Sequence, residues 1–101
     1  MPAGELAQEI QRAEAPMILD VRTVKEYRAG HIPGAVNIPI AELARRLAEL
    51  EPYRARPMVV HCESGPRAWH AARMLYEAGF TEVHELAGHM RAWRGAGYPM
   101  E

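Results

Sequence analysis

The only cysteine of the chain, Cys62, stands where a strand signal gives way to a helix signal. Val59 and Val60 precede it, Gly65 follows in a short loop, and a helical run begins near Arg67. Backbone N–H groups that turn from a strand into a helix point at one spot, and the helix dipole adds partial positive charge there. Both features favour a thiolate, the nucleophilic form of cysteine. The sequence therefore indicates a reactive Cys62; the alternative is a small buried core residue, since free cysteine is often buried.

The side chains that follow Cys62 have opposing effects on anion binding. Arg67 adds a full positive charge, and its guanidinium has the fork geometry that suits oxyanions, so we expect it to bind an anion; the alternative is a surface arginine at the start of a helix. Pro66 donates no N–H group, and Glu63 adds a negative charge. The loop is thus predicted to bind an anion, with Glu63 as the side chain that opposes binding.

A metal site at the cysteine is not expected. The chain has five His residues but no pair of cysteines, whereas structural zinc sites combine several cysteine or histidine ligands. His61 and Cys62 are neighbours at a strand end, so their side chains are predicted to point to opposite faces of the sheet. We therefore expect neither a metal nor another cofactor.

Strand and helix signals alternate along the chain. Strands are predicted at 17–21, 35–38, 58–61 and 81–86, and helices at 3–14, 40–50, 66–78 and 88–94. A further short helix follows the capping box of Thr23 and Glu26 and ends at the next glycine. This alternation predicts an α/β fold with a mainly parallel sheet, in which ligands bind beyond the carboxyl ends of the strands. Cys62, Asp20 and Arg22 all lie just past such ends.

Length and composition limit the possible functions. The 101 residues fit a single domain, 1–101, and the net charge of −1 offers no basic face for nucleic acid. No run of about 18 apolar residues predicts a membrane span, and the first residues lack the features of a signal peptide. A lone cysteine is consistent with a reducing compartment. We expect a cytoplasmic protein with no nucleic-acid or membrane partner.

Four groups of residues resemble, in order and spacing, the motifs of the rhodanese-like sulfurtransferases. They are Asp20-Val21-Arg22 with Glu26-Tyr27; the run from Gly30 to Pro39; Cys62-Glu63-Ser64-Gly65-Pro66-Arg67; and Leu86, Gly88, Trp93, Gly97 and Pro99. The likeness extends from about Met17 onward and is to the small single-domain members. It implies a three-layer α/β/α fold whose sheet has four strands, or five with a vestigial edge strand.

The resemblance also implies an activity, that of a thiosulfate sulfurtransferase. Cys62 would attack the outer sulfur of a donor such as thiosulfate and carry the sulfur as a persulfide. A small thiophilic acceptor (cyanide or a thiol) would then remove it. Because the chain has no second cysteine to resolve the persulfide, the acceptor must come from outside. The acceptor could also be a partner protein.

The same resemblance assigns roles to the residues around Cys62. Glu63, Ser64, Gly65, Pro66 and Arg67 would form the substrate-binding loop. Three residues outside that loop are expected to support it: Asp20 bracing the loop, Arg22 pairing with Glu26 four residues on, and His31 as a satisfied loop histidine.

Two other functions remain open. A sulfur-carrier or regulatory module that acts on a partner protein is favoured by Glu63, which stands where the family has a basic or neutral residue and should disfavour a dianionic donor. A small phosphatase or arsenate reductase is disfavoured, because four residues separate Cys62 from Arg67 where those enzymes have five. A further departure from the family pattern is His89, which replaces the second glycine of a Gly-Gly pair.

Overall fold

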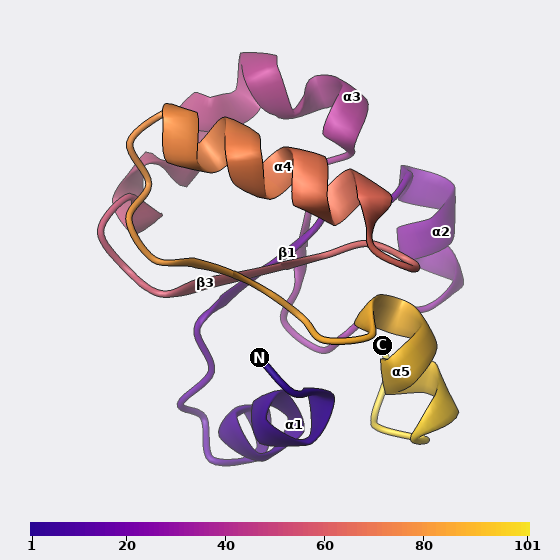
Figure 1. Cartoon of the computed structure of the whole chain (residues 1–101). Helices are drawn as coiled ribbons and strands as arrows, with labels where there is room; N and C mark the ends of the chain where they lie inside the picture. Colours follow the sequence, from indigo (N-terminus) through magenta and orange to yellow (C-terminus); the bar gives the residue numbers. More distant parts are fainter.

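Four parallel strands form the sheet in the computed structural model, which describes residues 1–101 (Figure 1). They are β1 (Met17–Asp20), β2 (Val36–Asn37), β3 (Met58–His61) and β4 (Val83–Glu85), in the order β2-β1-β3-β4. Asp20 is in register with His61, so the central strands β1 and β3 end level with each other. The parallel α/β sheet predicted from the sequence is confirmed, with four strands and no fifth edge strand.

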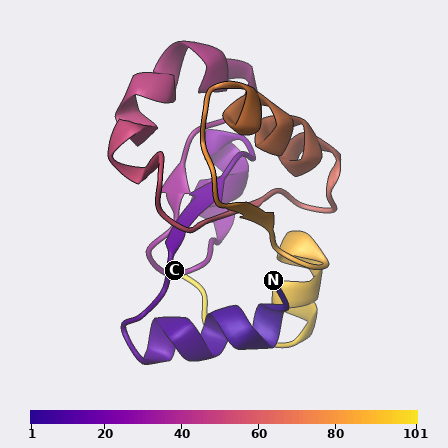
Figure 2. The same cartoon turned by 60° about the vertical axis from the view of Figure 1, so that its left-hand side comes forward.

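Helices cover both faces of the sheet, as Figure 2 shows. On one face lie α1 (Ala3–Gln11) and α5 (His89–Gly95); on the other lie α3 (Ile40–Leu43), the 3-10 helix η1 (Ala44–Tyr53) and α4 (Pro66–Glu77). The short helix α2 (Val24–Ala29) follows β1 and lies beside the N-terminal end of α4 (Figure 1). None of these helices is long and apolar enough to cross a membrane.

Successive residues of the central strands supply the two cores. Ile18 and Val59 belong to the cluster under α1 and α5, whereas Leu19 and Val60 belong to the cluster under η1 and α4. The alternation follows from the two-residue repeat of a strand, and burial on both faces explains why these strands are continuously apolar. The three-layer α/β/α architecture is therefore confirmed.

The segment predicted as one helix at 40–50 has a different structure. Only Ile40–Leu43 is α-helical, and a 3-10 helix then continues to Tyr53. A 3-10 helix has three residues per turn, so Leu47, Leu50 and Tyr53 align on one side, and all three contribute to the core cluster on this face. A spacing of three between leucines fits an α-helix as well as a 3-10 helix, so the sequence pattern does not distinguish the two.

Helix α4 begins at a proline and is followed by a glycine, as helices often are. Pro66 occupies its first turn after Gly65, and small alanines on its inner face (Ala68, Ala71 and Ala72) are buried against the sheet. At its end Gly79 has a φ of 95°, and the N–H of Phe80 donates to the carbonyl of Leu75 at 3.0 Å. The first turn of α4 is thereby fixed directly behind the cysteine loop.

Candidate active site

The loop from Cys62 to Gly65 connects the end of β3 to the start of α4. Cys62 is only 1% exposed and packs in the core cluster below α4. Its sulfur is nevertheless not in a purely apolar setting, because the N–H of Gly65 donates to Sγ at 3.1 Å. The carbonyls of Cys62 and Glu63 accept from the N–H groups of Met90 and Arg91 in α5, at 3.1 and 3.2 Å. The loop is thus anchored on one side by α5 and on the other by α4.

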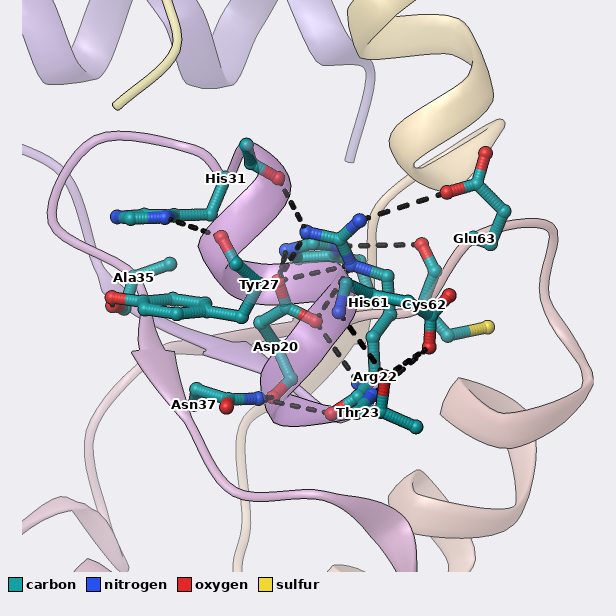
Figure 3. Close-up of polar contacts among 12 residues, drawn as sticks. Asp20, Arg22, Thr23, Tyr27, His31, Ala35, Asn37, His61, Cys62 and Glu63 are labelled. Atoms are coloured by element: carbon teal, nitrogen blue, oxygen red, sulfur yellow. Dashed lines mark hydrogen bonds and ion pairs between the residues drawn. The ribbon is translucent and has the colours of Figure 1, made fainter.

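A buried ion pair lies behind the loop. The guanidinium of Arg22 donates to Asp20 through Nε at 3.0 Å and Nη2 at 2.8 Å, and both residues are almost fully buried. Nη2 also donates to the carbonyl of Gly30 at 2.8 Å. Figure 3 shows the Cys62 sulfur directed away from this pair. Asp20 therefore reaches the loop only indirectly, because Arg22 Nη1 lies 3.7 Å from Glu63 Oε1.

The predicted pairing of Arg22 with Glu26 is wrong. Arg22 folds back along the sheet edge to Asp20, two residues earlier, and this bidentate contact occupies its guanidinium. Glu26 instead accepts two hydrogen bonds from Arg67, at 2.6 and 3.1 Å. It also completes the predicted capping box of α2 with Thr23. Because the Glu26 carboxylate is held at the helix N-terminus by Thr23 and Arg67, it is not available to pair with Arg22.

Arg67 is thus paired in this structure. The hydrogen bonds from Arg67 lower the pKa of Glu26 to about 2, so the pair stays ionised at neutral pH. Part of the positive charge expected to attract an anion is offset by Glu26. The role of Arg67 as an anion-binding residue stays a prediction.

Glu63 is paired as well. Arg94 of α5 donates to its two carboxylate oxygens at 2.8 and 3.3 Å, and this contact lowers the pKa of Glu63. With Arg22 also nearby, the negative charge of Glu63 is partly compensated. Ser64 and Pro66, the other two loop residues, are exposed.

The paired charges border a cavity of about 250 Å³ beside the loop, between α2 and α5. Its lining includes Arg22, Glu26, Glu63 and Arg94, with Met100 at the side. A ligand entering here meets guanidinium and carboxylate groups in close alternation.

His31 is not part of the cysteine loop. Its ring stacks on Tyr27 with centroids 3.7 Å apart, and Nδ1 lies 2.9 Å from the Tyr27 carbonyl oxygen. Nε2 is 3.6 Å from a carboxylate oxygen of Glu101. Figure 3 shows the stacked rings of His31 and Tyr27 across the Asp20–Arg22 pair from Cys62. One ring nitrogen therefore faces its own helix end and the other the C-terminal residue, and no contact connects the ring to the Cys62 sulfur.

His61, by contrast, is fully buried beside Asp20. Its Nε2 lies 3.8 Å from Asp20 Oδ2 and has no hydrogen-bond partner, and Nδ1 lies 3.2 Å from the Cys62 carbonyl oxygen. Burial lowers the pKa of His61 despite the nearby carboxylate, so the ring is neutral. The structure contains no group of three His, Cys, Asp or Glu side chains placed to hold a metal ion.

Sequence reasoning did not assign His89 to the site. Its Nδ1 accepts the N–H of Cys62 at 3.3 Å, and its backbone φ is 52°, in the left-handed region. The only signal in the sequence was the departure from the family's glycine pair. Contacts between residues 27 positions apart are not visible in local spacing.

Comparison with known proteins gives matches over nearly the whole chain. The family described as "Rhodanese-like domain" matches residues 2–96. The HTH-type transcriptional regulator Rv0324 of Mycobacterium tuberculosis is 46% identical, covering 94% of this chain and 42% of the regulator. The putative sulfur carrier protein YrkF of Bacillus subtilis is 39% identical, covering 87% of this chain and 46% of that protein. The chain therefore spans less than half the length of these two relatives.

Other relatives are of similar size. The thiosulfate sulfurtransferase GlpE of Shewanella oneidensis is 34% identical, covering 87% of this chain and 85% of that protein. The crystal structure of the Alr3790 protein from Anabaena superposes with a TM-score of 0.90 at 36% identity, covering all of this chain and 81% of the other.

Proposed function

Because this chain belongs to the rhodanese-like domain family, we propose that it transfers a sulfane sulfur from a small donor to an acceptor through a persulfide on Cys62. The observation that carries the proposal is the hydrogen bond from Gly65 N–H to Cys62 Sγ, at the carboxyl end of a central parallel strand. An N–H group aimed at the sulfur stabilises the thiolate that attacks the donor.

Thiosulfate is the proposed donor, since relatives of similar size are thiosulfate sulfurtransferases. The Cys62 thiolate attacks the outer sulfur of thiosulfate, a new S–S bond forms, and the electron pair of the old S–S bond leaves with sulfite. Cyanide or a thiolate then attacks the terminal sulfur, and the electron pair returns to Cys62 as the thiolate. No proton has to be moved once Cys62 is ionised, so no general base is required.

A sulfur-carrier role is the second candidate. It is supported by the pairing of both loop charges, because Arg67 is held by Glu26 and Glu63 by Arg94. Neither arginine offers an unopposed positive charge to a dianion such as thiosulfate. In this form Cys62 would be loaded by a persulfide donor and unloaded by a protein thiol.

Formation of thiocyanate from thiosulfate and cyanide tests the first candidate. Wild-type protein should turn over many times, and Cys62→Ser should fall to the rate measured without protein. Rapid loading with sulfur but slow turnover would favour the carrier role. Equal turnover by Cys62→Ser would reject both, because each requires the sulfur to be held on Cys62.

A further inference from the structure

The imidazole of His89 contacts both ends of the cysteine loop. Its Nδ1 accepts the N–H of Cys62 at 3.3 Å. Its Nε2 lies on the side of Gly65, where a Cβ added to that glycine would come within 3.4 Å of it. Gly65 is the residue whose N–H donates to the Cys62 sulfur. One buried ring therefore holds the Cys62 amide and lies next to Gly65, whose N–H donates to the Cys62 sulfur.

The backbone at His89 is unusual for a residue with a side chain. Gly88 and His89 have successive φ angles of 74° and 52°, and the only other non-glycine residue with positive φ is Ala13. A side chain in the left-handed region is strained, so it persists where its contacts compensate. The hydrogen bond from the Cys62 N–H to the His89 ring offsets the backbone strain at His89.

The hydrogen bond determines the form of the ring. An amide N–H can only donate, so Nδ1 carries a lone pair and the proton of the neutral ring is on Nε2. Nε2 lies 3.7 Å from Glu85 Oε1 in β4. Burial lowers the pKa of His89, and the carboxylate of Glu85 acts in the opposite direction. The other titratable group close enough to act on the ring is the neutral His61 at the end of β3.

We propose that His89 is a positioning residue: its neutral ring holds the Cys62 amide and supports Gly65, so that the Gly65 N–H stays aimed at the sulfur. Protonation of the ring would add a hydrogen to Nδ1, where it would face the hydrogen of the Cys62 N–H. The two donors would repel each other, and the loop would have to shift. This inference rests on the proposed role of Cys62 as the reacting residue. It goes beyond that role in assigning the alignment of the loop to a side chain of α5.

Two substitutions separate the hydrogen bond from the backbone strain. His89→Gly relaxes the backbone but removes the acceptor and the ring. His89→Asn tolerates positive φ and places an amide oxygen near the Nδ1 position, but it cannot be protonated. Ala13→Gly is the control for relief of strain away from the loop, and His84→Asn is the control for loss of an exposed histidine on β4.

The readout is the rate at which iodoacetamide alkylates Cys62 between pH 5 and 8, which does not depend on sulfur transfer. We expect His89→Gly to lower the rate at pH 7 about tenfold, the loss typical of one hydrogen bond. His89→Asn should recover most of that loss. Its alkylation rate should also decrease less steeply than that of wild type below pH 6. Both controls should follow wild type.

Two results would overturn the inference. One is alkylation of His89→Gly at the wild-type rate. The other is the same decrease in alkylation rate below pH 6 in wild type and in His89→Asn. If thermal melting shows that His89→Gly is unfolded, the comparison of wild type with His89→Asn decides alone. Because alkylation needs only a reactive Cys62, a failure of thiosulfate turnover leaves this result interpretable. Conversely, normal turnover in all variants would reject the positioning role without affecting the proposed function.

Discussion

The guanidinium of Arg67 holds both carboxylate oxygens of Glu26, at 2.6 and 3.1 Å, across 41 residues of sequence. The contact joins the first turn of α4, which directly follows the cysteine loop, to the capping box of α2. Arg67, which is predicted to bind an anion, is therefore already a member of an ion pair.

Replacing Glu26 by glutamine should free Arg67 for an anionic donor. Glutamine can keep the capping-box contact with Thr23, so the change removes mainly the charge. We expect the KM for thiosulfate to fall about threefold, within the range measured for partly exposed ion pairs. Steady-state kinetics should show no such change in Glu49→Gln, which breaks a similar bidentate pair with Arg46 away from the loop. An unchanged KM in Glu26→Gln would mean that Arg67 does not bind the donor.

The stability conferred by Glu26 should depend on pH in a defined window. Its pKa is lowered from 4.5 to about 2, chiefly by the hydrogen bond from Arg67. A lowered pKa in the folded state contributes stability that is full above the unfolded value and is lost as pH falls through the folded value. Urea denaturation should therefore show wild type losing its advantage over Glu26→Gln between pH 4.5 and 2. A constant difference across that window would contradict the pairing.

Glu63→Gln should increase the affinity for thiosulfate through electrostatics. The change releases Arg94 and removes a negative charge 3.7 Å from Arg22. We expect a decrease of about twofold in KM at low ionic strength, which disappears in high salt because the site is partly exposed. Glu63→Lys should act in the same direction and more strongly. Glu51→Gln, which breaks a surface pair with Arg54, is the matched control. A salt-independent effect would indicate a steric rather than an electrostatic cause.

Asp20→Asn should destabilise the fold more than a substitution that breaks a surface ion pair. Arg22 is 2% exposed, and the substitution leaves its buried charge with only the more distant, partly exposed Glu63, 3.7 Å away, as a counter-ion. We expect a loss of about 3 kcal/mol in the free energy of unfolding by urea. The double variant Asp20→Asn/Arg22→Met should be less destabilised than the single one, because it removes the buried charge. A decrease in the free energy of unfolding of less than about 1 kcal/mol would mean that the pair contributes no more than a surface salt bridge does.

Local patterns in the sequence predicted the fold and the place of the loop. Buried runs such as Met58–His61 and the glycine, proline and capping signals around α4 and α2 are encoded within a few residues of each element. The same holds for Cys62, whose position after a strand and before a helix can be seen without knowing what packs against it.

The partners of the charged side chains were not predictable in this way. Whether Arg22 pairs with Asp20 or Glu26 depends on how the chain turns at the sheet edge, and spacing favoured the wrong partner. Arg67 with Glu26, Glu63 with Arg94, and Cys62 with His89 come from elements brought together only by the finished fold. These contacts set the electrostatics of the site, which is why the sequence alone overstated the free charge of both Arg67 and Glu63.

The most direct test of sulfur transfer through Cys62 is the intact mass of the protein after incubation with thiosulfate and removal of excess donor. Wild type should gain the mass of one sulfur atom and lose it again on addition of cyanide, with fragmentation placing the added sulfur on Cys62. Cys62→Ala should gain nothing. Uptake of sulfur by Cys62→Ala, or no uptake by wild type from thiosulfate or a low-molecular-weight persulfide, would contradict the account.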